Sequence, residues 1–295
     1  MADGFVQEPA PLLELRDVSK RFDRPPDLAE RIIRLLGAPP RAALPPAVDH
    51  VSLSVAPGEV LGLVGESGSG KSTLGRIAAS LHAPSSGSRW WKGRDMDAMD
   101  AADRRRTRLA IQMIFQDPYA SLNPRMQVQD IIGEAPLAHG MVDARRQRDY
   151  VASLMRQVGL DPALMQRFPH QFSGGQRARI GIARALAVKP AFLVCDEAVA
   201  ALDVSIQAQV LNLFMQLREE LQLTAIFISH DLTVVRHVAD RVAIMVRGKV
   251  VELGPTETVF DAPRHAYTRA LLAAAPRLEV GKIAYVPAVP DDPLN

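Results

Sequence analysis

The sequence predicts an α/β fold in which helices cover a largely parallel sheet. Five short apolar runs lack the polar alternation of a half-exposed strand, and continuous runs of this kind are typical of strands buried on both faces. Helical patterns separate several of the runs, notably over 204–221 and 231–238, which favours helices packed on the faces of the sheet. The five runs are Val60–Val64, Ile111–Phe115, Ala191–Cys195, Ala225–Ile228 and Val242–Val246.

In chain order, two further strands and two insertions complete the prediction. Polar and apolar residues alternate over 12–18 and again over 51–55, so each of these segments is predicted to be a half-buried strand. Prolines bound the stretch over 23–46, which we interpret as an insertion around one short helix. The segment 117–187 shows helical and turn patterns without a strong strand, so we expect an inserted helical subdomain there.

The composition indicates a globular protein. Of its 295 residues 47% are hydrophobic and 23% charged, and the net charge of +2 gives no reason to expect a nucleic-acid partner. The densest basic run, 104–108, is interpreted as the solvated face of a short polar helix. Cys195 is the one cysteine of the sequence, so we expect it to be a small buried hydrophobe. Because no run approaches the ~18 apolar residues of a membrane span, we expect a cytoplasmic protein.

A phosphate-binding loop is predicted directly after the first of the five apolar runs. Its spacing is G-x-x-x-x-G-K-[ST], in which glycines let backbone N–H groups and the following helix start point at phosphate oxygens. Lys71 would place a charge near the β and γ phosphates, and the Ser72 hydroxyl would bind Mg²⁺. A dinucleotide fold is the rival interpretation, but it needs G-x-G-x-x-G and gives Lys71 and Ser72 no role. The predicted ATP-binding residues of this loop are Gly65, Glu66, Ser67, Gly68, Ser69, Gly70, Lys71, Ser72 and Thr73.

Two carboxylates, Asp196 and Glu197, follow another of the apolar runs. Such a strand end lies at the carboxyl edge of the sheet, where the phosphate loop also opens. Asp196 would hold Mg²⁺, and Glu197 would accept a proton from the attacking water. A solvated acidic turn is the alternative that this segment, taken alone, leaves open.

A second anion-binding helix start is predicted where residues 172–176 read F-S-G-G-Q before a helical pattern. Here the sequence resembles the ATP-binding cassette (ABC) family, whose signature is [LF]-S-G-G-Q. The resemblance implies a P-loop NTPase fold with a mixed sheet core, an inserted helical subdomain and an antiparallel β subdomain. It also implies that two cassettes pack head to tail, so that each signature covers the γ-phosphate held by the other. The residues that would act in trans are Ser173, Gly174, Gly175 and Gln176.

Other positions match family elements in the same order. Gln116 matches the glutamine loop that reaches Mg²⁺, and Asp203 lies in the loop that crosses the dimer interface. His230 matches the switch histidine that contacts the γ-phosphate, and Phe22 lies where the family stacks an aromatic ring on adenine. The resemblance thus implies catalytic roles for Glu197, His230 and Gln116, and Mg²⁺ ligation by Ser72, Gln116 and Asp196.

Several longer phrases resemble the oligopeptide, dipeptide and nickel importers of this family. These phrases are Gln116–Arg125, Pro169–Arg177, Asp203–Val210 and His265–Leu272, and Ser72–Arg76 resembles the second ATPase of the pair. The resemblance implies a nucleotide-binding domain over 1–260 and, over 261–295, the C-terminal extension of these importers. In such systems two related ATPases commonly form a heterodimer below two permeases, and an external binding protein delivers the solute. A homodimer is the alternative.

The resemblance implies an ATPase at the cytoplasmic face of a membrane that powers import of oligopeptides, dipeptides or a related solute. Ala198 replaces the usual proline, as in the nickel branch, so a nickel or metal-chelate importer is an alternative. Ala200 replaces a usual serine near the dimer interface. The cysteine-rich tail of many relatives is missing, which predicts no iron–sulfur cluster. A soluble cassette protein acting on ribosomes or DNA is the alternative from another class.

Overall fold

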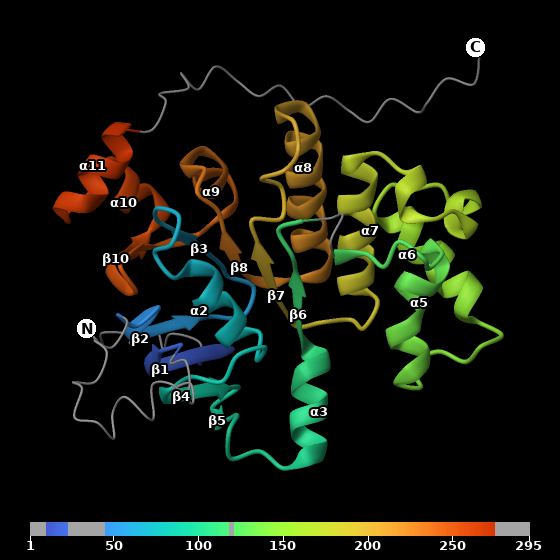
Figure 1. The fold of residues 1–295 in the computed structure, drawn as a ribbon, viewed down its shortest axis with the longest axis horizontal. Helices are drawn as coiled ribbons and strands as arrows, with labels where there is room; N and C mark the ends of the chain where they lie inside the picture. The colour runs from blue at the N-terminus through green and yellow to red at the C-terminus, as the bar shows by residue number, and fades with distance from the viewer. Residues whose placement is uncertain (1–9, 23–44, 118–120, 275–295) are drawn as a thin grey trace, which may run out of the picture.

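The computed structural model of the protein describes residues 10–22, 45–117 and 121–274 (Figure 1). The predicted insertion over 23–46 lies almost wholly outside the described residues, together with the helix expected within it. The part of the predicted C-terminal extension after residue 274 also lies outside them. The boundaries of the domains and subdomains accordingly stay predictions.

A six-stranded mixed sheet forms the centre of the molecule, in the order β10-β9-β3-β8-β7-β6. All neighbouring strands run parallel except β10, which pairs antiparallel with β9. The strands are β3 (Val60–Val64), β6 (Ile111–Ile114), β7 (Phe192–Asp196), β8 (Thr224–Ile228), β9 (Arg241–Val246) and β10 (Lys249–Pro255). The five apolar runs are therefore confirmed as strands, with shifts of at most one residue. β10 was not predicted, because its residues are partly or fully exposed and form no continuous apolar run.

A second, antiparallel sheet has the order β2-β1-β4-β5. Its strands are β1 (Leu13–Lys20), β2 (Val48–Val55), β4 (Ser86–Trp91) and β5 (Arg94–Asp95). The alternation over 12–18 and 51–55 is confirmed as β1 and β2, whose apolar residues are buried on one face. The mixed core sheet and the antiparallel sheet confirm the fold class that the resemblance implied.

The helices lie on both faces of the core sheet and in a separate group beyond β6 (Figure 1). Those near the sheet are α2 (Lys71–Ala78), α3 (Ala101–Ala110), α8 (Val204–Leu221), α9 (Leu232–Val238), α10 (Thr256–Asp261) and α11 (Ala266–Ala274). The separate group comprises α5 (Val128–Ala138), α6 (Gln147–Gln157), two short 3₁₀ turns (Pro162–Gln166 and Pro169–Gln171) and α7 (Gly174–Leu186). None of the helices in the described part of the chain has the length and hydrophobicity that a bilayer crossing requires.

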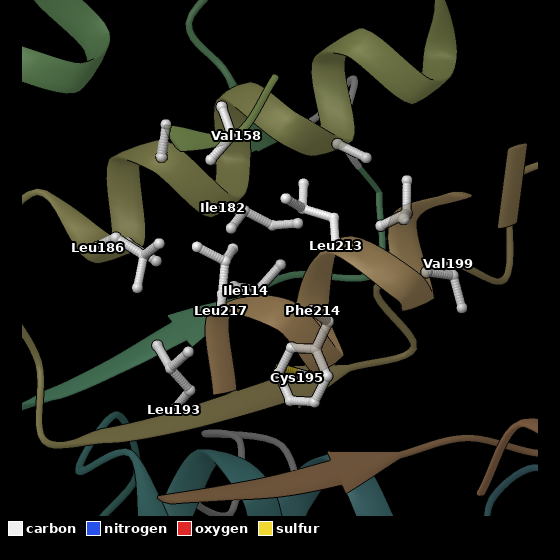
Figure 2. Packing of buried hydrophobic residues seen from close by; sticks show 14 of the residues in the cluster. Ile114, Val158, Ile182, Leu186, Leu193, Cys195, Val199, Leu213, Phe214 and Leu217 are labelled. Atoms are coloured by element: carbon white, nitrogen blue, oxygen red, sulfur yellow. The ribbon is translucent and has the colours of Figure 1, made fainter. Parts of the chain in front are cut away.

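Helix α7 joins the helical group to the core sheet. Figure 2 shows Ile182 and Leu186 of α7 above Leu213 and Leu217 of α8, with β7 beneath them. Cys195 lies in the same cluster, where burial raises the pKa of its thiol to about 12. This thiol is protonated at physiological pH, which confirms the expectation of a small buried hydrophobe.

An aromatic contact joins the two sheets. The ring of Trp91, on β4, meets the ring of Phe192, on β7, edge to face with centroids 6.2 Å apart. Phe192 is fully buried, so the contact lies in the apolar layer between the antiparallel sheet and the core sheet. The position of the antiparallel sheet over the core therefore depends on this layer.

Replacement of Phe192 by alanine is expected to lower the free energy of unfolding by about 3–5 kcal/mol, because it leaves a cavity between the sheets. Urea denaturation followed by circular dichroism measures this change. Phe22→Ala is the matched control, since that ring is 50% exposed, and its expected effect is about 0.5 kcal/mol or less. Equal losses in the two variants would contradict the role given to the inter-sheet layer.

Candidate functional site

The loop between β3 and α2 adopts a backbone conformation that only glycine permits at two positions. Gly65 and Gly70 have φ angles of 155° and 104°. A Cβ atom at Gly65 would collide with the carbonyl oxygen of Met245, and one at Gly70 with that of Ala47. No side chain caps the start of α2, and its first turn holds no acidic residue. The N–H groups of this helix start are thus available to an anion.

Lys71 lies buried under the loop that precedes it. Its ammonium group donates to the carbonyl oxygens of Gly65, at 2.7 Å, and Glu66, at 2.8 Å. Burial lowers the pKa of Lys71, while the nearby carboxylates of Glu197, Asp196 and Glu66 oppose that shift. The amine is thereby held at a fixed place beside the predicted phosphate site.

A hydrogen bond connects the loop to the carboxyl end of β7. The Ser72 hydroxyl donates to Asp196 Oδ1 at 2.8 Å, although 124 residues separate the two. Burial raises the pKa of Asp196, and the bond from Ser72 opposes this shift. A nearby cation would favour the charged form of this buried carboxylate. Carboxylate and hydroxyl oxygens are donors that Mg²⁺ prefers, so the pair fits the predicted metal.

Glu197 lies between the other two residues that the resemblance assigns to catalysis. The amide nitrogen of Gln116 donates to Glu197 Oε2 at 2.6 Å, and His230 Nδ1 lies 3.5 Å from Oε1. Glu197 has a φ angle of 48°, and its N–H donates to the Ile228 carbonyl at 3.0 Å. No sequence pattern signals this left-handed backbone conformation directly after β7. The Gln116 amide bonds to Glu197 rather than to Asp196.

Phe22 lies beyond the end of β1, and half of its side chain is exposed. Its ring meets the ring of His82 edge to face, with centroids 5.7 Å apart. The Ala47 N–H donates to the Lys20 carbonyl at 2.8 Å, and the Ala47 carbonyl faces Gly70. These contacts tie the end of β1 to the phosphate loop. His82 had not been singled out from the sequence.

The predicted signature forms the start of α7. The Ser173 hydroxyl accepts from the Gln176 N–H at 3.3 Å, and the Gln176 side chain accepts from the Ser173 N–H at 3.0 Å. Gly175 packs so closely against Ile206 that a Cβ atom would collide with that side chain. Asp203 caps α8 by accepting from the Ile206 N–H at 3.0 Å. The signature and the loop at Asp203 therefore form one packed unit.

This unit lies away from the phosphate loop of the same chain. In Figure 1, α7 is on one side of α8, and β3 and α2 are on the other. Val204, at the start of α8, is 84% exposed. The structure thus brings together the loop, Asp196, Glu197, Gln116 and His230, and keeps the signature apart from them.

Two further features, one at the phosphate loop and one away from the site, had not been predicted. The hydroxyl of Tyr267 accepts a hydrogen bond from the Glu66 N–H at 3.2 Å. A groove of about 720 Å³ lies between α3 and the end of α5. Its lining includes Arg104, Arg105 and Arg108 of the basic run. Sequence spacing carries no signal for either, since both depend on segments distant in the chain.

Comparison with known families gives two matches. The family model described as "ABC transporter" matches residues 48–200. The model described as "Oligopeptide/dipeptide transporter, C-terminal region" matches residues 251–293. Together these matches extend over the phosphate loop, the signature and helix α11.

Individual relatives and a solved structure agree with these two family matches. An oligopeptide transport ATP-binding protein of Bacillus subtilis, AppF, is 48% identical over 266 residues, which cover 90% of this chain and 78% of that one. The OppF protein of Salmonella typhimurium is 48% identical over 276 residues, 93% of this chain and 80% of its own. A dimeric ATP-binding cassette solved in a post-hydrolysis state with ADP and Pi superposes with a TM-score of 0.69 at 25% identity. That match covers 83% of this chain and 98% of the other.

Gly70→Ala is expected to weaken ATP binding by at least about tenfold, because the new Cβ atom collides with the Ala47 carbonyl and shifts the loop. Isothermal titration calorimetry with ATP measures the change. Gly58→Ala is the control, since Gly58 also has a positive φ angle, 76°, but has open space around its Cβ position. Comparable loss of affinity in both variants would show that backbone strain anywhere in the chain produces the effect.

Proposed function

This chain belongs to the ABC transporter family of ATPases, and we propose that it hydrolyses ATP to power the import of oligopeptides or dipeptides through a membrane permease. The hydrogen bond between Ser72 and Asp196 carries the proposal, because it sets the phosphate loop beside the strand end that bears Glu197. The relatives AppF and OppF, described as oligopeptide transport proteins, support peptide as the solute. Their similarity also favours peptide over the nickel alternative that Ala198 left open.

In the proposed reaction, water attacks the γ-phosphorus of ATP and the bond to the β–γ bridging oxygen breaks, which releases ADP and phosphate. Glu197 would take the proton from the attacking water. The bond from Gln116 fixes one carboxylate oxygen, and His230 lies near the other. Both neighbours restrict the rotation of the Glu197 side chain, so its basic oxygen would be held toward the water rather than mobile in solvent.

Charge neutralisation on the phosphates would come from Lys71 and from Mg²⁺. When bound, Mg²⁺ would be held by Ser72 and Asp196, with Gln116 as a further proposed ligand, and would supply positive charge to the phosphate oxygens. Lys71 is preorganised for the same purpose by its two bonds to loop carbonyls. Preorganised charge of this kind stabilises a transition state without further rearrangement.

A second cassette is part of the proposal. The signature at Ser173 lies across α8 from the phosphate loop of the same chain, so it would serve the nucleotide of a partner. The exposed Val204 beside Asp203 would be covered in such a dimer. A related ATPase, in a heterodimer, or a second copy of this chain could supply the partner.

The basic groove between α3 and α5 is a proposed contact for the permease. Arg104, Arg105, Arg108 and His139 line it, and none of the described residues in its lining carries a carboxylate. Arg105 Nη2 lies 3.1 Å from His139 Nδ1, so two basic side chains meet there. An acidic segment of a permease loop would complement this charge. Attachment there would hold the chain at the cytoplasmic face of the membrane. An extracytoplasmic binding protein would supply the solute at the opposite face.

Glu197→Gln is expected to lower kcat for ATP hydrolysis by about 10²–10⁴-fold while the Kd for ATP stays near the wild-type value, because the base is lost and the phosphate contacts are kept. Phosphate release and calorimetry measure the two quantities. Glu134→Gln, at an exposed position on α5, is the control with unchanged kcat. Wild-type kcat in Glu197→Gln would rule out the assigned base, and unchanged peptide uptake by the assembled transporter would rule out the proposed function.

Arg105→Glu is expected to weaken binding to the permease by at least about tenfold, since it reverses a charge in the groove. Co-purification and binding of the reconstituted permease at two salt concentrations measure the effect, which salt should reduce. The matched control is Arg106→Glu on the same helix, because Arg106 is not among the groove residues and faces Asp103 at 3.7 Å. Equal weakening by both variants would argue against the groove as the contact.

A further inference from the structure

Helix α11 of the C-terminal region touches the phosphate loop. The Tyr267 hydroxyl accepts a hydrogen bond from the Glu66 N–H at 3.2 Å, across 201 residues of sequence. Tyr267 also packs against the large hydrophobic cluster that contains β3 and α9. The contact therefore links a segment outside the sheet to the residue that follows Gly65 in the loop.

Several contacts hold α11 in this position. The carboxylate of Glu252, on β10, accepts hydrogen bonds from the N–H groups of Arg264, at 2.8 Å, and His265, at 3.0 Å. These bonds fix the turn from which the helix begins. The Tyr267 N–H donates to His265 Nδ1 at 3.2 Å, and Thr268 is fully buried. Tyr267 is thus presented by a fixed helix start rather than by a loose tail.

The backbone N–H and the backbone carbonyl of Glu66 both form hydrogen bonds. Its N–H donates to Tyr267, while its carbonyl accepts from the Lys71 ammonium at 2.8 Å and from the Ser69 N–H at 3.1 Å. A continuous hydrogen-bonded path therefore runs from Tyr267 through Glu66 to Lys71. The Tyr267 hydroxyl is two hydrogen bonds away from the ammonium group that the phosphates would meet.

We propose that Tyr267 is a positioning residue that braces the phosphate loop and couples the C-terminal region to ATP binding. The inference rests on the proposed role of residues 65–73 in binding ATP. Burial and the nearby Glu66 carboxylate raise the pKa of Tyr267, while the hydrogen bond from the Glu66 N–H opposes this shift. Without this acceptor the Glu66 N–H would have to bond to water, and the loop would lose one of its fixed points.

The coupling has a reciprocal consequence. If the brace favours the loop conformation that binds nucleotide, then nucleotide binding must stabilise the brace to the same extent. Backbone amides of α11 should therefore exchange more slowly with solvent when nucleotide is bound. This protection should depend on the Tyr267 hydroxyl, because the Glu252 bonds hold only the turn that precedes the helix.

The test compares the full chain with its Tyr267→Phe and Tyr150→Phe variants. Both substitutions remove one hydroxyl that forms a backbone contact, since Tyr150 donates to the Ala187 carbonyl at 2.7 Å, within the helical group. Calorimetry with Mg²⁺ and the non-hydrolysable analogue AMP-PNP gives Kd, thermal melting gives Tm, and hydrogen exchange reports on residues 266–274. Tyr267→Phe is expected to raise Kd by about 3–10-fold and to abolish the nucleotide-dependent protection of α11. Tyr150→Phe should leave both at wild-type values.

Three outcomes would overturn the brace. If the wild-type chain binds AMP-PNP and Tyr267→Phe has the same Kd, the brace is overturned while the proposed function stands. An equal rise of Kd in both variants, with equal falls in Tm, would reduce the effect to general destabilisation and would also overturn it. Failure of the wild-type chain to bind AMP-PNP would overturn the phosphate-loop assignment and the brace together.

Discussion

Parallel pairing of the core strands is the constraint on which the site depends. Because β3, β8, β7 and β6 run in the same direction, their carboxyl ends meet at one edge of the sheet. The phosphate loop follows β3, Asp196 ends β7, and His230 and Gln116 follow β8 and β6 shortly after their last residues. Residues from four separate parts of the chain are thus brought together by backbone hydrogen bonds, before any side chain interacts.

Burial at this edge gives the site its electrostatic character. Burial lowers the pKa of Lys71 and raises the pKa of Asp196, so each charged form is less favourable there than in water. A phosphate group beside Lys71 and a cation beside Asp196 would each relieve this cost. Desolvation of Lys71 and Asp196 therefore accounts both for their shifted pKa values and for the expected affinity of the site for a phosphate and a cation.

The sequence predicts those strands whose burial follows a regular pattern, either continuous or alternating. Val60–Val64 is buried along its whole length, so its apolar run reports the strand directly. Lys249–Pro255 lies at the exposed edge of the sheet and leaves no such pattern. The phosphate loop was predictable because its glycines, Lys71 and Ser72 stand at the fixed spacing of a known phosphate-binding motif. The left-handed backbone of Glu197 and the bond between Tyr267 and Glu66 were not, because each arises from packing between segments far apart in sequence.

The phosphate loop is held from its outer side by three separate parts of the chain. The Ala47 carbonyl lies against Gly70, the Gly248 N–H donates to the Ser69 carbonyl at 2.9 Å, and the Tyr267 hydroxyl accepts from the loop at its start. These contacts fix the loop without occupying the N–H groups at the start of α2. The conformational entropy of ordering the loop is then lost on folding rather than on binding. A nucleotide would meet a preformed set of donors, and its binding energy would remain available for closing the interface with a partner cassette.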